Sequence, residues 1–149
     1  MKRQATSMTR RTLLGAGIVG AALPHLAWAE EQKHMKARFM FADHDFTVTL
    51  NDSPSARDFA SMLPLDLTFS DFSNEKIAYL PRKLHLEASG SFPNAAAGDL
   101  CYYIPWGNLA FFHGDYISTR DLIRLGRIDG AIEPLLTRGE FPLRIERLS

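Results

Sequence analysis

One arginine in the middle of the sequence could do chemistry on a bound peptide or acid. Arg82 follows Pro81 in the segment Tyr79–Lys83. A guanidinium can hydrogen-bond a prolyl amide and lower the roughly 18–20 kcal/mol barrier to rotation about that bond. It can also hold a ligand carboxylate through paired hydrogen bonds. The structural alternative is an arginine that pairs with Asp99 or with a backbone carbonyl.

A second group of residues could bind a flat or apolar ligand. Trp106 precedes Gly107 and Asn108 in a connection between two apolar runs. An exposed indole ring in this place could stack on a proline or on a planar molecule, whereas Gly-Asn by itself is ordinary turn chemistry. Tyr103 and Phe112 flank the connection and are further candidates, although aromatic residues in strands more often belong to the core.

The histidines and the single cysteine add little further chemistry. His113 follows the second apolar run and could reach a ligand groove. His44 lies between Asp43 and Asp45, but adjacent residues in a tight turn rarely converge on one metal ion. Cys101 lies within an apolar run and is predicted to be buried and inert. We expect no metal and no cofactor, because the sequence has no metal-ligand spacing, phosphate loop, nucleophile elbow or dinucleotide fingerprint.

The first 29 residues have the pattern of a twin-arginine export signal. Arg10 and Arg11 follow a threonine and precede an apolar stretch that is too short and glycine-rich to span a bilayer. A small-x-small site ends at Ala29, and we expect cleavage after this residue. The alternatives are a signal anchor that is not cut and a general secretory signal that contains two arginines. The sequence therefore predicts a periplasmic or secreted protein, with a polar tether over residues 30–35.

Composition limits the partners of the mature chain. The chain has 149 residues, of which 17 are basic and 17 acidic. The leader carries four of the basic residues and no acid, which leaves 13 basic against 17 acidic residues and a net charge near −4. This balance argues against nucleic acid as a partner and against an electrostatic membrane anchor. A lone cysteine cannot form an intrachain disulfide, so burial of the core must stabilise the domain.

Alternating apolar residues predict a mainly β domain over residues 36–149. Residues 36–41 and 46–51 alternate cleanly, and Asp43–Asp45 is expected to be the turn between them. Residues 65–70 and 141–146 alternate in the same way. Shorter strands are expected at residues 77–80, 83–86, 100–104, 109–112 and 122–128.

Helices are few. Ser53 is a suitable N-cap and Pro54 suits the first helical position. The residues that would form the apolar stripe of this helix are Ala56, Phe59, Ala60 and Leu63. Pro64 ends the helix, and residues 132–136 can make one further helical turn. Seven or eight strands with one or two short capping helices favour a small closed antiparallel β-barrel, since closure removes exposed strand edges.

Several segments, in this order, resemble the bacterial cyclophilin-like fold proteins. They are Ser55–Ala60, Glu75–Leu84, Gly98–Leu100, Pro105–Leu109 and Leu125–Ile128. The resemblance extends from about residue 36 to the C-terminus and implies an eight-stranded barrel of cyclophilin type. The Gly-Ser-Gln-Phe-Phe-type signature of true cyclophilins is not present, so the resemblance implies the scaffold and not isomerase activity.

We therefore expect a domain that binds a ligand and does not transform it. A groove near Arg82, Trp106 and Phe112 would accept a peptide segment or a small, anionic, partly apolar molecule. The alternative is a peptidyl-prolyl cis-trans isomerase that acts on periplasmic proteins, because isomerisation needs only a groove, a hydrogen-bond donor and desolvation. A third possibility is an interaction module that accompanies another exported protein.

Overall fold

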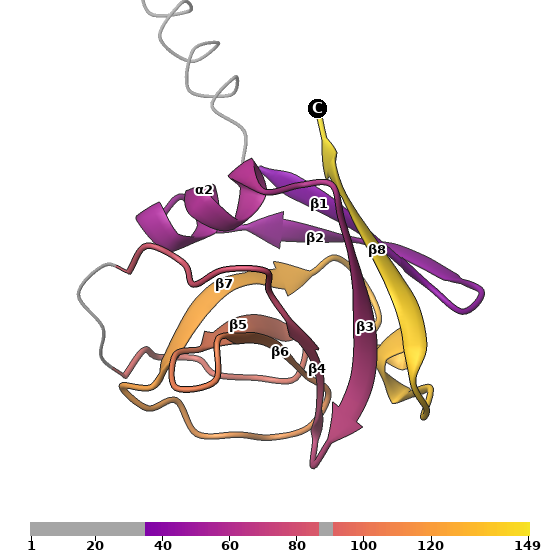
Figure 1. Ribbon diagram of the computed structural model, residues 1–149. Helices are drawn as coiled ribbons and strands as arrows, with labels where there is room; N and C mark the ends of the chain where they lie inside the picture. The colour runs from indigo at the N-terminus through magenta and orange to yellow at the C-terminus, as the bar shows by residue number, and fades with distance from the viewer. Residues whose placement is uncertain (1–34, 87–90) are drawn as a thin grey trace, which may run out of the picture. The chain divides into compact units, whose positions relative to one another are not determined.

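Eight antiparallel strands close into a barrel, as the alternation of apolar and polar residues predicts (Figure 1). The structure is a computed structural model and describes residues 35–86 and 91–149. Around the barrel the strands follow the order β1-β2-β7-β5-β6-β4-β3-β8, and β8 pairs with β1 again. The elements are β1 (Lys36–Phe41), β2 (His44–Leu50), α2 (Pro54–Ser61), β3 (Leu65–Phe72), β4 (Glu75–Tyr79), β5 (Asp99–Tyr103), β6 (Asn108–Phe112), β7 (Leu122–Ile128), the 3-10 turn η1 (Glu133–Leu136) and β8 (Phe141–Leu148).

The core fills the interior of the barrel with large apolar side chains. Every strand turns alternate residues inward, so the wall has a packed inner side and an outer side. The largest aromatic residues of this core are fully buried: Phe39, Phe59, Phe69, Tyr102 and Phe111. The burial of these side chains stabilises the fold, which has no disulfide because the chain has a single cysteine.

The first hairpin has a tighter turn than the sequence suggested. Ala42 and Asp43 form a two-residue turn, with Phe41 directly opposite His44. Ala42 adopts a positive φ of 51°, a conformation that such tight hairpin turns require. The prediction of a turn at Asp43–Asp45 is therefore wrong, because His44 and Asp45 already belong to strand β2.

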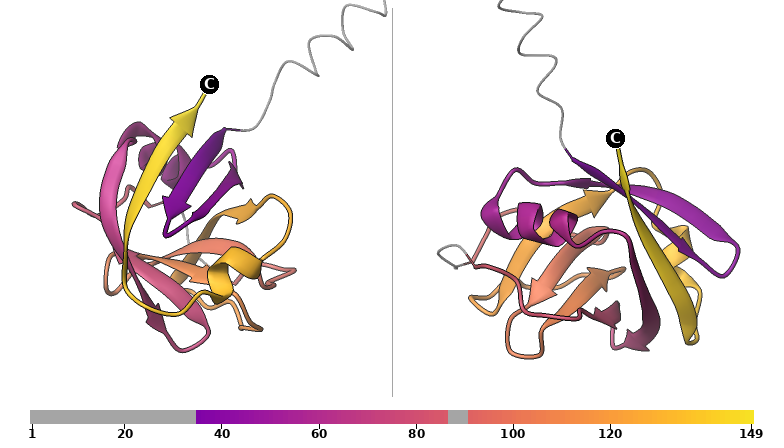
Figure 2. Two further views of the ribbon diagram at one scale, coloured as in Figure 1. Left: turned by 90° about the vertical axis from the view of Figure 1, so that its right-hand side faces the viewer. Right: turned by 45° about the horizontal axis from the view of Figure 1, so that its top comes forward.

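Helix α2 begins as its sequence predicts. The side chain of Ser53 accepts a hydrogen bond from the Ala56 amide at 3.2 Å, which satisfies one of the free donors of the first turn. Phe59 and Ala60 are buried and join the barrel core. The helix packs against β7 (Figure 2), and the short turn η1 falls within the second predicted helical segment.

One predicted strand is a loop. Residues 83–86 do not pair with another strand, because side chains satisfy their backbone amides. The Leu84 amide donates to the Tyr102 hydroxyl at 3.4 Å, and the His85 amide donates to Asp58 at 2.8 Å. His85, which we expected to point outward from a strand, is exposed in this loop.

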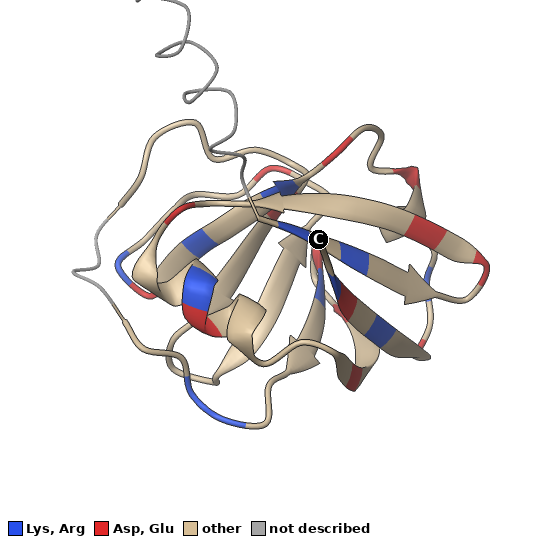
Figure 3. Cartoon of the chain, turned by 90° about the horizontal axis from the view of Figure 1, so that it is seen from above, with Lys and Arg blue, Asp and Glu red and all other residues tan. Residues whose placement is uncertain are grey.

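The predicted export signal and its predicted cleavage point lie outside the described residues. The ordered domain already includes Met35, the last residue of the predicted tether, whose carbonyl accepts a hydrogen bond from the Leu50 amide at 2.8 Å. Within residues 35–86 and 91–149, no helix is both long and apolar enough to cross a membrane. Figure 3 shows that basic and acidic residues alternate along the strands and loops of the domain, with no large region of one sign in this view.

Candidate functional site

Three neighbouring strands, β4, β6 and β5, have buried side chains on both sides of the wall. Phe111 and Tyr102 point into the barrel core, whereas their neighbours Phe112 and Cys101 belong to a second, smaller cluster. This second cluster lies on the outer side, because successive residues of a strand face opposite ways. The segments that precede β5 and follow β6 contribute Phe92 and Tyr116 to it, and so cover part of this outer wall.

A pocket of about 450 Å³ opens beside this second cluster. It lies between the end of the β3–β4 hairpin, the β5–β6 connection and the chain that leads into β7. Four of its lining side chains are aromatic, one is aliphatic and two are carboxylates, and they come from different elements. The lining residues are Phe72, Glu75, Tyr103, Trp106, Phe112, Thr119, Asp121 and Leu122.

The β5–β6 connection presents Trp106 to this pocket. Gly107 adopts a positive φ of 71° and its amide donates to the Tyr103 carbonyl at 2.9 Å, which closes the turn. The indole ring meets the rings of Phe72 and Tyr103 edge to face, each with centroids 5.4 Å apart. Trp106 nevertheless stays 49% exposed, so its ring remains open to a ligand.

The opposite wall of the pocket is held in place from behind. Phe112 stacks on Tyr116 with centroids 3.7 Å apart and ring planes 7° from parallel. The Tyr116 hydroxyl donates to the buried carboxylate of Asp99 at 2.7 Å, and Arg127 forms an ion pair with the same carboxylate at 2.8 Å. These contacts tie Tyr116 to the barrel wall and so support Phe112 from behind.

Glu75 gives the pocket an ionisable group. It is the first residue of β4, opposite Phe72 in the hairpin and opposite Phe112 in β6. Burial raises the pKa of its carboxyl to about 7, and no described residue forms a hydrogen bond or ion pair with it. Near neutral pH this carboxyl can therefore either donate a hydrogen bond or carry a negative charge.

Arg82 does not line this pocket. Its guanidinium makes two hydrogen bonds to the carboxylate of Asp58 in α2, at 2.8 and 2.9 Å. These bonds hold the pKa of the Asp58 carboxyl far below its usual range. Arg82 thus ties the loop after β4 to the helix. Of its two predicted structural partners, the backbone carbonyl is confirmed, because Arg82 also donates to the Lys83 carbonyl at 3.1 Å. Asp99 is wrong, because it pairs with Arg124 and Arg127 instead.

The other predicted chemical groups also lie elsewhere. His113 is the next residue after β6, its Nε2 is buried without a partner, and burial and then Arg138 lower its pKa. The His44 ring lies 2.7 Å from the Thr137 hydroxyl, and no cluster of metal-ligating residues occurs in the described part of the chain. Cys101 is buried as predicted, and burial raises the pKa of its thiol to about 12.

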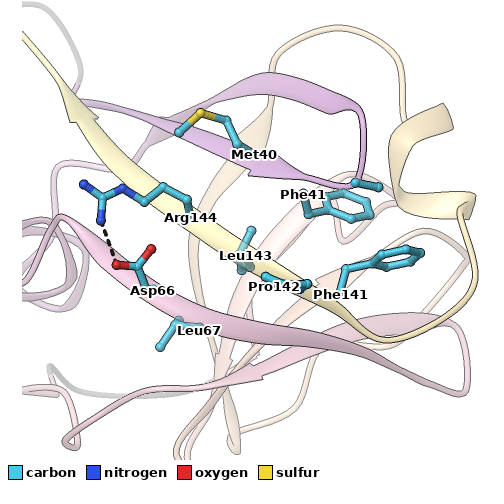
Figure 4. Close-up of a pocket in the computed structure, with 9 residues that line it drawn as sticks. Met40, Phe41, Asp66, Leu67, Phe141, Pro142, Leu143 and Arg144 are labelled. Atoms are coloured by element: carbon cyan, nitrogen blue, oxygen red, sulfur yellow. Dashed lines mark hydrogen bonds and ion pairs between the residues drawn. The ribbon is translucent and has the colours of Figure 1, made fainter.

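A second hollow lies on the outer face of β1, β8 and β3, with a volume of about 410 Å³ (Figure 4). Its walls include Met40, Leu67 and Pro142. The two charged groups at its edge, Asp66 and Arg144, pair with each other at 2.7 Å. Its two charged side chains thus neutralise each other, whereas the carboxylates of the aromatic pocket have no ion-pair partner among the described residues, and we place the candidate site in the aromatic pocket.

The structure brings together three of the five predicted ligand-binding residues: Tyr103, Trp106 and Phe112. Sequence reasoning did not select Glu75 and Phe72, which enter the pocket from the β3–β4 hairpin. Their signal was present, because the two-residue turn at Ser73 and Asn74 places them opposite each other. That signal became readable only once the hairpin and its neighbour β6 were known.

Comparison with known proteins agrees with this architecture. The sequence profile of the cyclophilin-like family matches residues 39–146. The chain belongs to the cyclophilin-like family. The solution structure of a hypothetical protein from Archaeoglobus fulgidus has the same fold as this cyclophilin-like domain, with a TM-score of 0.60, 21% sequence identity and coverage of 77% of this chain and 95% of that one. No curated protein matches the sequence of this chain.

Proposed function

We propose that this cyclophilin-like chain is an exported ligand-binding domain whose aromatic pocket takes a peptide segment or a small molecule. The observation that carries the proposal is the half-exposed Trp106, held edge to face by Phe72 and Tyr103 above a pocket of about 450 Å³. This volume lies within the range of about 300–1,000 Å³ typical of small-ligand sites. Exposed rings in a fixed arrangement bind with little loss of conformational entropy.

The pocket supports binding better than prolyl isomerisation. An isomerase would need a donor that reaches the prolyl amide. The guanidinium that the sequence offered for this role, Arg82, is held by Asp58 away from the pocket. The donors in the described lining are hydroxyls, the indole N–H of Trp106 and the protonated form of Glu75, and none of them is a cation. The ionisable groups of the lining are the carboxyls of Glu75 and Asp121. We therefore expect a neutral or cationic ligand, and not the anionic ligand that Arg82 suggested.

The binding proposal is tested with a panel of proline-containing peptides and small aromatic compounds, followed by calorimetry and by mapping of NMR shifts. We expect ligands to shift resonances of the pocket and Trp106→Ala to weaken their binding at least about tenfold. Leu136→Ala is the matched control, since Leu136 is also 49% exposed but does not line the pocket. Ligands that shift other surfaces only, or that bind Trp106→Ala unchanged, would refute the site.

A prolyl-isomerisation assay on the same samples separates the two functions. Binding without acceleration of isomerisation supports the ligand-binding proposal. Acceleration that is lost in Trp106→Ala would make the pocket catalytic and would replace the proposal with the isomerase.

Export rests on the leader sequence. We expect the full chain to appear in the periplasm, cut after Ala29, and the change of both Arg10 and Arg11 to lysine to leave the uncut precursor inside the cell. Arg3→Lys is the matched control, because Arg3 lies outside the twin-arginine pattern. Periplasmic accumulation of the double variant at the wild-type level would rule out the twin-arginine route.

A further inference from the structure

The charged side chains of the aromatic pocket indicate the charge of its ligand. Its described lining contains the two carboxylates Glu75 and Asp121 and no basic side chain. Neither carboxylate has an ion-pair partner among the described residues, whereas most other acidic side chains of the barrel wall are paired. A cation that entered the pocket would therefore meet unpaired negative charge beside aromatic rings.

The rings of the pocket meet edge to face and do not stack on one another. Trp106 meets Phe72 at 75° and Tyr103 at 89°, so in each pair the edge of one ring approaches the other. An edge-to-face contact covers one face of one ring and leaves the remaining faces of the pair free of each other, and ring faces carry the negative part of the aromatic quadrupole. Such faces attract ammonium groups, and several together form the aromatic cages that bind alkylated ammonium ions.

The same protein holds an ammonium in this way inside the barrel. The Nζ atom of Lys76 lies 5.5, 5.6 and 6.0 Å from the ring centroids of Phe41, Phe69 and Phe141. One carboxylate, that of Asp71, lies 2.8 Å from the same atom. Aromatic rings plus a carboxylate thus suffice in this barrel to hold a cation that has lost its water.

On these grounds we propose that the aromatic pocket binds the trimethylammonium group of a small molecule, an inference that rests on the pocket being the ligand site proposed above. A quaternary ammonium suits the pocket better than a primary one, because it is weakly hydrated and spreads its charge over methyl groups that pack against rings. Glu75 and Asp121 supply the countercharge, and Phe72, Tyr103 and Trp106 supply the ring faces.

The test compares choline with 3,3-dimethylbutan-1-ol, its uncharged carbon isostere. Both are titrated into the full chain carrying Trp28→Phe, so that Trp106 is the only tryptophan and its fluorescence reports on the pocket. We expect choline to bind at least about tenfold more tightly than the isostere. Glu75→Gln should remove most of this preference and leave the weak binding of the isostere unchanged, while Glu140→Gln, an exposed glutamate outside the pocket, should change neither.

The outcomes separate this inference from the function on which it rests. Equal affinity for both compounds overturns the cation inference and leaves the pocket as a binding site. Failure of choline to perturb Trp106, while members of the peptide and aromatic panel do so, has the same meaning. If no compound of either set perturbs Trp106 in a folded sample, the cation inference and the proposed function both fail.

Discussion

Glu75 and Lys76 are neighbours in strand β4, yet their charges lie on opposite sides of the barrel wall. Lys76 is fully buried in the interior, with Asp71 at 2.8 Å and three phenylalanine rings around it. Glu75 faces outward into the aromatic pocket and has no partner among the described residues. Both sides therefore combine a charge with aromatic rings, but only the inner charge is neutralised by the protein itself.

The difference distinguishes a structural charge from one that is available to a ligand. A buried ion needs its counterion inside the fold, because removal from water costs several kcal/mol. A half-exposed ion without a partner keeps part of its hydration and stays free to meet another molecule. The following substitutions test this contrast, from the largest expected effect to the smallest.

Asp71→Asn, on the inner side of the wall, should destabilise the domain more than the other substitutions proposed here. The change leaves the Lys76 ammonium buried without its counterion, so the free energy of unfolding should fall by about 3 kcal/mol, measured by urea denaturation. Asp66→Asn is the control, because the Asp66 side chain is 74% exposed and its pair with Arg144 lies in solvent. The control should cost less than about 1 kcal/mol.

A double-mutant cycle with Lys76→Met sharpens the same point. Once the buried ammonium is gone, Asp71→Asn should cost clearly less than it does in the wild type. Additive costs of the two changes would mean that Asp71 does not stabilise the fold through Lys76.

Glu75→Gln, on the outer side of the wall, should raise the free energy of unfolding, whereas Asp71→Asn lowers it. Burial raises the pKa of this carboxyl from its usual 4.5 to about 7, so the folded state takes up a proton that the unfolded state releases. Stability therefore declines as the pH rises from about 4.5 through 7, and the variant, which has no charge, should lose this decline. We expect a gain of about 1 kcal/mol at pH 8, reduced for the half-exposed position, and none at pH 4.

Thermal and urea unfolding across this pH range provide the measurement, with Glu140→Gln as the variant that should leave the profile unchanged. A Glu75→Gln variant that is less stable than the wild type at pH 8 would show that the carboxylate has a stabilising partner, and the contrast with Lys76 would be lost.

Arg82→Ala should have the smallest effect. Arg82 is exposed in its pair with Asp58, so its loss should lower the free energy of unfolding only slightly at pH 7. Because the pair lowers the pKa of Asp58, its contribution is present above the ordinary pKa of an aspartate, and the difference between variant and wild type should shrink as the pH falls below about 4.

Binding of pocket ligands should not change in Arg82→Ala, since Arg82 does not line the pocket. Calorimetry on the folded variant decides the matter. A loss of affinity of about tenfold or more would return Arg82 to the ligand site and would require the loop to move on binding.

The barrel itself was largely readable in the sequence. Clean alternation in β1, β2 and β8 predicted both the strands and their buried faces, and Ser53 with Pro54 predicted the start of α2. The strand prediction was wrong where side chains, and not a neighbouring strand, accept the hydrogen bonds of the backbone amides. Residues 83–86 alternate like a strand, but the Tyr102 hydroxyl and the Asp58 carboxylate accept their amides.

The candidate site was readable only in part. Trp106 and Tyr103 were marked by their place beside a glycine turn, which is a local signal. Glu75 and Phe72 entered the site through the pairing of β4 with β3 and β6, a contact between segments far apart in the chain. Arg82 looked like the strongest candidate because its partner Asp58, 24 positions earlier in the chain, could not be inferred from the sequence.

By itself the sequence determined a closed β-barrel with one capping helix, because period-two alternation and a capped apolar stripe act within single elements. It also marked the aromatic residues of the β5–β6 connection, and it predicts an export leader with two arginines outside the described residues. Only the tertiary structure decided which charges stay free. Whether a carboxylate or a guanidinium has a partner depends on strands and loops that meet from distant parts of the chain, and that pairing separates Glu75 from Lys76 and Arg82.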